Sequence, residues 1–599
     1  MITHISRIFS SKRWLKVVTV VPFIVFGVVA LLIVYPQIKV RGMVLGADSL
    51  FHIQRLYDTA MQISHHNFSY FQTNYGFQQS ARIVNALYGP YFAYFMGIIL
   101  LMSGTWINFQ IVTSIMLIFC SSTGMYLLCR RSGAYKSSAV LSALLFSTTG
   151  WLPAWITGQE FTSWGTLFMP FVLICGVRMV MNHSVPVRVV PLALSVTLIV
   201  QVHMLSSIFA VVTLIPFFIV GMQKAADPKK MFVKTIFAAF ITLLMTANVW
   251  GAMINVFGSN HLISPYSVSN MGTVTLQLSP GANSLFRLGL FPTIIALFQI
   301  SYVVLNRSST TVNRVLTYVG AIFLLCSTNF LPWESISKTI PALTRFLQFP
   351  ARLQTISMVL LWAGVSLTLT SIKDISTHKK NSKLKMAYCC IYVVSFFGVL
   401  TLCAYQRSIL MDQVNIWFSA QTIQRPTNVY VATNTSKQKI RDAFSSKNLS
   451  KGVQLVSKGT SDYLPQPAKD IEANKSLNLY QEYTEQVTKI NPMFTKKVLP
   501  NGELEISWKS KSKQSIQLPV IGYNRSYIKL NGRRLNNIEL RHTNIGAIIV
   551  PSNKGKNKVI ISYQSGIGFH ILLIVSMLSI VFFVMWYAIA EIRRTKMKI

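Results

Sequence analysis

The sequence predicts an α-helical, polytopic membrane protein of about twelve spans with a folded extramembrane domain before the last span. Hydrophobic residues make up 52% of the 599-residue chain, more than soluble domains usually contain. Apolar segments of roughly 20 residues, the length that crosses a bilayer, recur along it. A single long polar stretch, 404–568, ends in alternating polar and apolar residues, which is the pattern of β-strands.

The apolar segments define the predicted spans. They cover residues 17–35, 106–128, 137–153, 162–180, 189–222, 231–254, 288–305, 315–330, 355–372, 386–402 and 569–590. Segment 189–222 is long enough for two short helices with a turn near His203, which brings the total to twelve. The first segment lacks a small-residue cleavage site, so we interpret it as a retained anchor and not as a removable signal peptide.

Basic residues set the predicted orientation. They gather in short connections such as "SKRWLK" at 11–16, "RRSGAYK" at 130–136 and "RRTKMKI" at 593–599. The positive-inside rule makes these connections cytoplasmic, so both termini lie in the cytoplasm and residues 404–568 lie outside. The apolar run 88–102 is short and opens near a Gly-Pro pair. We expect it to be a re-entrant or interfacial helix within the first outer loop, 36–105.

Carboxylates are scarce, and their distribution is informative. The chain has 17 Asp and Glu, of which ten lie in 404–568. Of the seven in the membrane part, Asp227, Asp374 and Glu591 fall in predicted cytoplasmic loops, where solvated charge explains them. The four that face outside are Asp48, Asp58, Glu160 and Glu334. Ionisable groups near membrane depth are costly unless paired or functional, so these four define a candidate site.

The four outer carboxylates do not carry equal weight. Asp58 and Glu334 are equally well explained as ordinary loop charges. Asp48 lies in "LGADSLFHIQRLYD" (45–58), beside Gly46 and ahead of aromatic and basic residues, which favours a functional role.

The stretch "GADSLFHIQR" resembles the start of the first outer loop in the GT-C superfamily of integral membrane glycosyltransferases, with the oligosaccharyltransferase catalytic subunits as the comparison. Phe51 and His52 have the expected spacing from Asp48, whereas Arg55 is one residue late. In that superfamily the second outer loop supplies a further acidic residue, and Glu160 is the candidate for it in this chain.

A resemblance that covers most of the chain is to bacterial YfhO-like proteins and the membrane family labelled "6-pyruvoyl-tetrahydropterin synthase related". It rests on "GADSLFHI", "RFLQFPARLQ" before a span, "SDYLP" at 461–465, "LPVIGYNRSYIKLNGRRL", and a last span ending in basic residues. No pterin-enzyme feature is present in the sequence.

The resemblance implies glycosyl transfer from a polyprenyl-phosphate sugar donor. Such a reaction needs a carboxylate to accept the acceptor's proton and cations to stabilise the departing phosphate. We assign Asp48 as the base, with Glu160 as its partner. Arg345 and Arg352 in "TRFLQFPARLQ" are candidates to bind the phosphate, because guanidinium groups offer paired donors. Both are equally well explained as interfacial anchors that reach lipid headgroups.

The remaining candidates are expected to bind substrate. His52 and Arg55 are three residues apart and share one face of a helix if the loop becomes helical after Asp48. His203 is a candidate donor or acceptor contact, although a lone histidine in such a turn is more often a hydrogen-bonded interfacial residue. Glu334 completes the set. Some relatives bind a divalent cation in these loops, but Asp48 and Glu160 alone make a thin site, so no metal ligand is assigned.

The outer block is predicted to be basic and, from about residue 500, β-sandwich-like. Apolar residues alternate around 504–508, 516–520 and 559–563, with turn signals such as "PNG" and "LNGRRL" between them. Helical patches are expected in "KQKIRDAFSS" and "KDIEANKSLNLYQEY". The block contains 24 Lys or Arg against 10 Asp or Glu, a net charge of +14, which favours anionic polymers or lipid headgroups. The compartment argues against nucleic acid as a partner.

These observations give one expected function and two alternatives. The expected protein is a glycosyltransferase of a bacterial cytoplasmic membrane that moves a sugar to a cell-envelope polymer or glycolipid on the outer face. Its parts are a membrane domain (1–403), a basic extracytoplasmic domain (404–568) and a last span with a cytoplasmic tail (569–599). The alternatives are a transporter or flippase of lipid-linked sugars or polymers, and a non-catalytic scaffold that binds envelope polymer.

Overall fold

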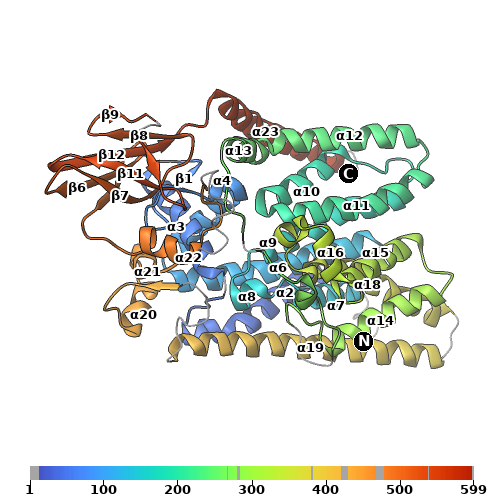
Figure 1. The fold of residues 1–599 in the computed structure, drawn as a ribbon. Coiled ribbons are helices and arrows are strands. Elements are labelled where there is room, and N and C mark those ends of the chain that lie inside the picture. The colour runs from blue at the N-terminus through green and yellow to red at the C-terminus, as the bar shows by residue number, and fades with distance from the viewer. Residues whose placement is uncertain are drawn as a thin grey trace.

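The computed structural model describes residues 12–46, 48–265, 267–279, 284–378, 382–419, 429–466, 478–536 and 539–596. Helices form an elongated body, and the strands gather at one end of it (Figure 1). The chain is therefore mostly helical, with an antiparallel β region before the last helix, as the sequence predicts.

Within the described residues, seven helices are long and apolar enough to cross a membrane. They are α2 (Lys12–Val40), α6 (Trp106–Arg131), α9 (Thr162–Met181), α11 (Met204–Lys224), α18 (Gln354–His378), α19 (Ser382–Phe418) and α23 (Ile567–Lys596). An eighth span results if the bent pair α12 (Pro228–Met245) and α13 (Ala247–Phe257) counts as one. Five further helices are apolar but shorter: α5 (Pro90–Ser103), α7 (Lys136–Ser147), α10 (Val189–Val202), α14 (Leu290–Leu305) and α15 (Thr311–Ser327). The multi-pass character of the chain is thus confirmed.

The predicted break near His203 is present. Helix α10 ends at Val202 and α11 begins at Met204, with His203 in extended backbone between them. The His203 ring accepts a hydrogen bond from the Ser206 backbone N–H, so the side chain caps the second helix.

Segment 231–254, predicted as one span, is bent by 63° between α12 and α13. The carbonyl of Met245, just before the bend, accepts hydrogen bonds from Ser576 Oγ (2.8 Å) and Gln201 Nε2 (3.3 Å). Side chains of neighbouring helices therefore satisfy the backbone that the bend exposes, which is how broken membrane helices are tolerated.

The first outer loop forms a compact unit. It contains α3 (Ser49–His65), β1 (Gln72–Thr73), β2 (Arg82–Ile83), α4 (Asn85–Tyr88) and the apolar helix α5. Helix α5 lies against α3, because Thr59 Oγ1 donates to the Ala93 carbonyl at 2.8 Å and a Cβ added at Gly97 would lie 2.8 Å from the same Oγ1.

Short elements complete the connections that the sequence predicts to lie outside. These are α8 (Ala154–Gly158), η1 (Met271–Val274), α16 (Trp333–Thr339), α17 (Ala342–Phe346) and η2 (Pro350–Leu353). Helix α19 is longer than the predicted segment 386–402. It runs along one side of the body to Phe418, past residue 403, where we had expected the outer block to begin (Figure 1).

Among the described residues, the part of the outer block from Thr495 onward forms two antiparallel sheets. One joins β7 (Gln514–Ile521), β10 (Arg541–His542) and β11 (Ala547–Ser552); the other joins β5 (Thr495–Val498), β6 (Leu504–Ser510), β8 (Ser526–Leu530), β9 (Arg533–Arg534) and β12 (Gly555–Tyr563). Their inward side chains form a single apolar core, which includes Ile506, Val520 and Val559. Trp508 Nε1 on β6 donates to Ser552 Oγ on β11 and links the sheets.

The part of the block before the sheets is irregular. It contains β3 (Val429–Val431), α20 (Lys437–Ser445), α21 (Ser450–Leu455), β4 (Val456–Lys458), α22 (Leu479–Tyr483) and a π-helical turn (Thr484–Thr488). Helix α20 confirms the first predicted helical patch. Of the second patch, 469–477 lies outside the described residues and α22 covers the end.

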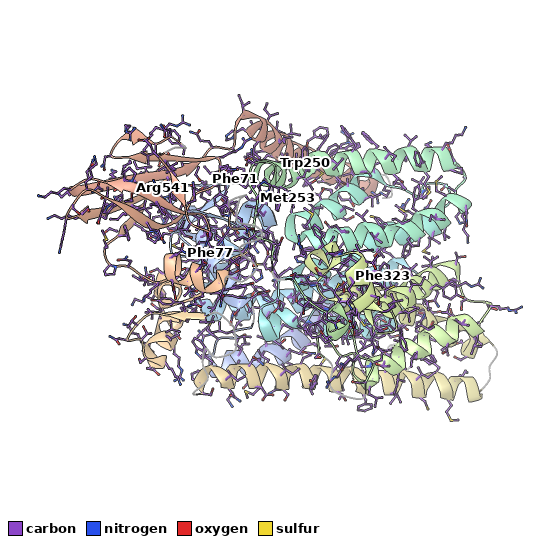
Figure 2. The ribbon with its side chains drawn as sticks, viewed as in Figure 1. Phe71, Phe77, Trp250, Met253, Phe323 and Arg541 are labelled. Carbon is purple, nitrogen blue, oxygen red and sulfur yellow. The ribbon has the colours of Figure 1, made fainter. Side chains whose placement is uncertain are left out.

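The outer block packs directly on the first outer loop. Asn74 Nδ2 donates to the Gly502 carbonyl (2.7 Å), and the Ile521 amide donates to the Ser80 carbonyl (2.8 Å). Phe71 joins an apolar cluster with Met253 of α13 and Phe569 of α23 (Figure 2). These contacts hold residues from distant parts of the sequence close to α3.

Candidate functional site

Asp48 lies at the N-terminus of α3 but does not cap it. Its side chain makes no capping hydrogen bond to the helix; Oδ1 instead accepts from Lys458 Nζ at 2.9 Å. Lys458 is the last residue of β4 in the outer block, and its side chain is 13% exposed, while that of Asp48 is 50% exposed. The carboxylate is thus paired yet open to solvent.

A close backbone approach brings Asp48 toward the second outer loop. A Cβ built on Gly46 would lie 2.0 Å from the Gly158 carbonyl oxygen, so only glycine allows this contact. Glu160 follows Gly158 by two residues, and its Oε1 lies 4.0 Å from a Cβ built on Gly158. The two loops that carry Asp48 and Glu160 therefore touch through their glycines.

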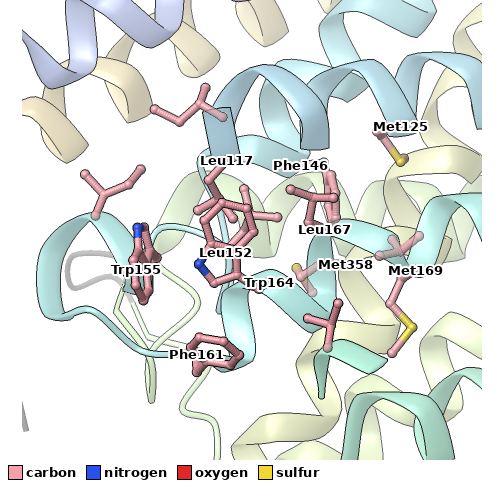
Figure 3. Packing of buried hydrophobic residues seen from close by; sticks show 14 of the residues in the cluster. Leu117, Met125, Phe146, Leu152, Trp155, Phe161, Trp164, Leu167, Met169 and Met358 are labelled. Carbon is pink, nitrogen blue, oxygen red and sulfur yellow. The ribbon is translucent and has the colours of Figure 1, made fainter. Parts of the chain in front are cut away.

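Aromatic side chains pack against one another beneath the backbone turn that carries Glu160 and stabilise it. The Trp155 ring contacts the rings of Phe161 (6.1 Å) and Trp164 (5.6 Å) edge to face, and all three side chains are buried (Figure 3). Ser163 Oγ accepts from the Trp155 amide and donates to the Trp151 carbonyl. These contacts stabilise the backbone conformation around Glu160.

Arg352 enters from a third segment, the predicted "RFLQFPARLQ". Its guanidinium lies over the rings of Phe349 (4.6 Å) and Trp151 (5.7 Å) and donates from Nη1 to Gln348 Oε1 at 2.8 Å. Trp151 Nε1 donates to the Ala351 carbonyl, which joins this segment to the turn of Glu160. The Arg352 Nε atom is buried without a hydrogen-bond partner.

The outer block contributes more than Lys458. The segment "SDYLP" places Asp462 and Tyr463 beside the first outer loop: Arg82 donates to the Asp462 carbonyl, and Tyr463 Oη donates to Tyr88 Oη at 3.4 Å. Oδ1 of Asp462 is buried without a hydrogen-bond partner. Burial raises the pKa of Asp462 above its ordinary value, although Arg82 partly offsets this.

His52 and Arg55 share one buried face of α3, as predicted. Arg55 Nη1 lies 3.2 Å from His52 Nδ1, and Arg55 Nε donates to Asn85 Oδ1. The His52 ring stacks on Phe161 at 4.7 Å, and the Arg55 guanidinium lies 4.0 Å from the centre of the Tyr88 ring. Burial and Arg55 hold the pKa of His52 well below its ordinary value, so the ring is neutral.

His203 lies within the same electrostatic neighbourhood. The charges of Arg352 and Arg55 act on its ring, while its Nδ1 is engaged with Ser206 Oγ at 2.8 Å. Its role as the cap of α11 accounts for its position between the two helices. Its ring lies near two arginines of the candidate site, Arg352 and Arg55.

Two further carboxylates lie outside this cluster. Glu334 pairs with Lys338 one helical turn away at 2.8 Å, and its side chain is 56% exposed. Asp58 is fully buried: its carboxylate accepts from the amides of Tyr75 and Gly76 and from Gln62 Nε2, so it holds the loop after α3 and is not an ordinary solvated charge. Arg345 is exposed on α17.

The protonation states of Asp48 and Glu160 differ. Partial burial acts to raise the pKa of Asp48, but the charges of Lys458 and Arg352 more than offset it, so that pKa lies below its ordinary value. Burial, and then the charge of Asp48, raise the pKa of Glu160 to about 8 against the opposing effects of Arg352 and Lys458. Near neutral pH, Asp48 is ionised and Glu160 is mostly protonated.

The donor set does not suit a hard divalent cation. Such ions take six or more oxygen ligands, whereas the site offers three side-chain carboxylates, Asp48, Glu160 and Asp462, the first of them bound to an ammonium group. No group of three or more His, Cys, Asp or Glu suited to a metal occurs in the described part of the chain.

The sequence did not identify Lys458, Asp462, Tyr463, Arg82 or Tyr88 as site residues. Lys458 is one of 24 cations in the outer block, so nothing local marks it. The segment "SDYLP" is part of the family resemblance. Its acid and tyrosine, Asp462 and Tyr463, are the sequence signal that could have identified these two site residues.

The fold and the cluster together define a multi-pass membrane protein with a mixed-charge site, where the loops that carry Asp48 and Glu160 meet the β-containing block. No family model and no curated protein matches the chain. Among solved structures it is similar to the cryo-EM structure of the arabinofuranosyltransferase AftD from Mycobacteria, with a TM-score of 0.41 and 15% identity. The match covers 67% of this chain and 27% of that one, so the chain spans about a quarter of that protein.

Proposed function

We propose that this protein is a GT-C-type glycosyltransferase that moves a sugar from a polyprenyl-phosphate donor to a cell-envelope acceptor. One observation carries the proposal: an ionised carboxylate, Asp48, lies in a cluster with a second carboxyl group, Glu160, and two cations, Lys458 and Arg352. These are the groups that such a transfer requires, and they belong to segments that flank membrane helices.

The chemistry assigns a role to each group. Asp48 accepts the proton of the acceptor hydroxyl while the acceptor oxygen forms a bond to the anomeric carbon. The bond from that carbon to the phosphate oxygen breaks, and its electron pair stays on the phosphate. Arg352 and Lys458 stabilise the resulting negative charge. Glu160, protonated near neutral pH, donates a hydrogen bond to the reacting oxygens.

Five further residues complete the proposed site. His52, Arg55 and His203 line the cluster and contact the donor or orient the charged groups. Arg345 and Glu334, exposed near the outer segments, contact the donor lipid's headgroup region or the acceptor at a distance from the reacting atoms.

The proposed topology has twelve spans. It adds four short apolar helices, α7, α10, α14 and α15, to the seven long ones and the bent pair, and it leaves α5 as an outer, interfacial helix. Both termini are then cytoplasmic in a bacterial membrane, and the Asp48 cluster and the basic block face outside. The net charge of +14 on 404–568 suits an anionic polymer or glycolipid acceptor.

The test is sugar release from a defined donor. The purified protein in lipid nanodiscs is incubated with synthetic polyprenyl-phosphate pentoses and hexoses labelled in the sugar, with a cell-envelope extract as acceptor. The expected result is transfer of label from the lipid to the aqueous or polymer fraction. Asp48→Asn should lower that transfer by about 100-fold or more, because the base is lost.

Asp442→Asn is the matched control, since Asp442 is exposed on α20 and, among the described residues, accepts a hydrogen bond from nearby Gln438 alone. If Asp48→Asn transfers sugar as fast as Asp442→Asn, the assignment of Asp48 is wrong. If no donor of the panel is consumed by the wild-type protein, the glycosyltransferase proposal is wrong.

The bent pair α12 and α13 favours a second candidate, a transporter or flippase of lipid-linked sugar, because broken membrane helices are common in transporters. Fluorescent lipid-linked sugar in proteoliposomes separates the two functions. A flippase moves the intact lipid across the bilayer without releasing its sugar. If the protein is instead a non-catalytic scaffold that binds polymer, Asp48→Asn leaves its polymer binding unchanged.

A further inference from the structure

A cavity lies on the other side of helix α3 from the Asp48 cluster. Its volume is about 400 Å³, within the range of small-ligand sites. Gln54 and Tyr57 of α3 line it, whereas His52 and Arg55 face the cluster; a helix turns by roughly 100° per residue, which separates these pairs. The opposite wall comes from the outer block, with Gln454, Thr488 and Lys496.

The walls of this cavity combine amides with aromatic rings. Glutamine and asparagine side chains both donate and accept hydrogen bonds, as sugar hydroxyls do. Tyr57, Tyr75 and Phe494 supply flat apolar surfaces on which the C–H face of a sugar ring can pack. The cavity therefore offers both parts of a saccharide-binding surface.

Two lysines give the cavity a positive charge. Lys496 Nζ donates to the carbonyls of Gln78 (2.7 Å) and Pro519 (2.8 Å), which leaves the third hydrogen of an ammonium group available. Lys489 lies on the exposed rim. No Asp or Glu is among the described residues that line the cavity, and burial lowers the pKa of Lys496 to about 7. An anion placed beside Lys496 would stabilise its charged form.

A buried hydroxyl in the wall has no protein partner. Thr488 is 0% exposed, and its Oγ1 makes no hydrogen bond. Buried polar groups are nearly always paired, so such a group beside a cavity points to a bound molecule that supplies the partner.

We propose that this cavity binds a negatively charged saccharide unit of a glycan chain, through Thr488 and the surrounding amides, with Lys496 beside its anionic group. The inference deepens the proposed function, on which it rests for the identity of the glycan as the acceptor. The cavity would hold one unit of the polymer while another reaches Asp48 around α3. Glycan binding is measured in the absence of sugar transfer. A negative binding result therefore contradicts the cavity proposal alone, and a negative transfer assay contradicts the proposed function alone.

The experiment is an isothermal titration calorimetry measurement. The full-length protein, in nanodiscs of zwitterionic lipid, is titrated with each of three probes. Hexagalacturonate carries both sugar rings and charge, maltohexaose carries rings alone, and an oligo(glycerol phosphate) carries charge alone. Hexagalacturonate is expected to bind tighter than either other probe by about tenfold or more, because only it uses both features of the cavity.

Three variants locate the binding. Lys496→Met and Gln454→Ala should each weaken hexagalacturonate binding, the first by about tenfold. Lys511→Met removes an exposed cation of the same domain, in the turn after β6, and should leave binding unchanged. Gln454 is exposed, and its side chain makes no hydrogen bond to another described residue, so its variant tests the cavity without disturbing the fold.

Two outcomes would overturn the proposal. The first is binding of oligo(glycerol phosphate) that matches hexagalacturonate, since that would indicate attraction to the basic surface alone. The second is binding of hexagalacturonate that is absent, or that Lys511→Met weakens as much as Lys496→Met and Gln454→Ala do.

Discussion

The Lys458 ammonium and the Asp48 carboxylate form an ion pair at 2.9 Å, although 410 residues separate them in the sequence. The pair joins the last strand before "SDYLP" in the outer block to the start of the first outer helix. The candidate site therefore exists only when the outer block is folded against the first outer loop.

Removing the ammonium should change the pH dependence of sugar transfer. Lys458 lowers the pKa of Asp48, so Lys458→Met raises that pKa. The ionised base then forms only at higher pH, and the acidic limb of kcat/KM moves upward. We expect a loss of about tenfold or more at pH 7, measured with the labelled donor between pH 5 and 9.

Lys458→Arg is the conservative control, because it keeps the charge and should restore most of the profile. An unchanged acidic limb in Lys458→Met would show that the pair does not tune Asp48.

Glu160 should make stability depend on pH. Its pKa of about 8 lies above the ordinary value of 4.5, so the folded protein holds this proton more tightly than the unfolded chain does. The stabilisation is complete below that ordinary value and is lost as the pH rises through the folded pKa. Glu160→Gln stays neutral, so its Tm should fall less than that of the wild type between pH 5 and 9.

Glu485→Gln, which changes an exposed carboxylate on the outer block, is the control for this measurement. Parallel Tm curves for the wild type and Glu160→Gln would contradict the raised pKa. Differential scanning fluorimetry in detergent is sufficient.

The close contact of Gly46 with Gly158 should be essential for activity. Gly46→Ala places a Cβ 2.0 Å from a backbone oxygen, so the two loops must separate and Glu160 moves away from Asp48. We expect a loss of about 100-fold in transfer with a folded, membrane-inserted protein. Gly27→Ala, at a position on α2 with nothing within 4 Å, should behave as the wild type. Equal activity of the two variants would show that the contact is dispensable.

Arg352 should bind the donor phosphate. Arg352→Lys keeps the charge but loses the planar paired donors and the contact with the Phe349 ring, so the KM for the donor should rise about tenfold with a smaller change in kcat. The comparison is Arg345→Ala, whose exposed side chain predicts a smaller effect. A larger effect from Arg345→Ala would reverse the two assignments.

The proposed orientation can be tested by labelling. In a variant without the seven native cysteines, Lys511→Cys in the outer block and Lys229→Cys at the start of α12 are both exposed positions. A membrane-impermeant maleimide added to intact cells should label only the first, because Lys229 is on the proposed cytoplasmic side. Labelling of Lys229→Cys alone would invert the topology.

The amino-acid sequence by itself determined the membrane class, the break at His203 and the antiparallel strands. These follow from local patterns: apolar length, a turn within an overlong segment, and alternation of side chains along a strand. Asp48 and Glu160 stood out because carboxylates are rare in the membrane part of this chain.

Only the tertiary structure decided what surrounds them. Lys458 pairs with Asp48 because the outer block packs on the first outer loop. Asp58 is buried and accepts hydrogen bonds from the backbone of the loop after α3. The 63° bend before α13 also depends on polar side chains from neighbouring helices. Such pairings join residues hundreds of positions apart, and no local pattern records them, because their energy arises only when the segments meet.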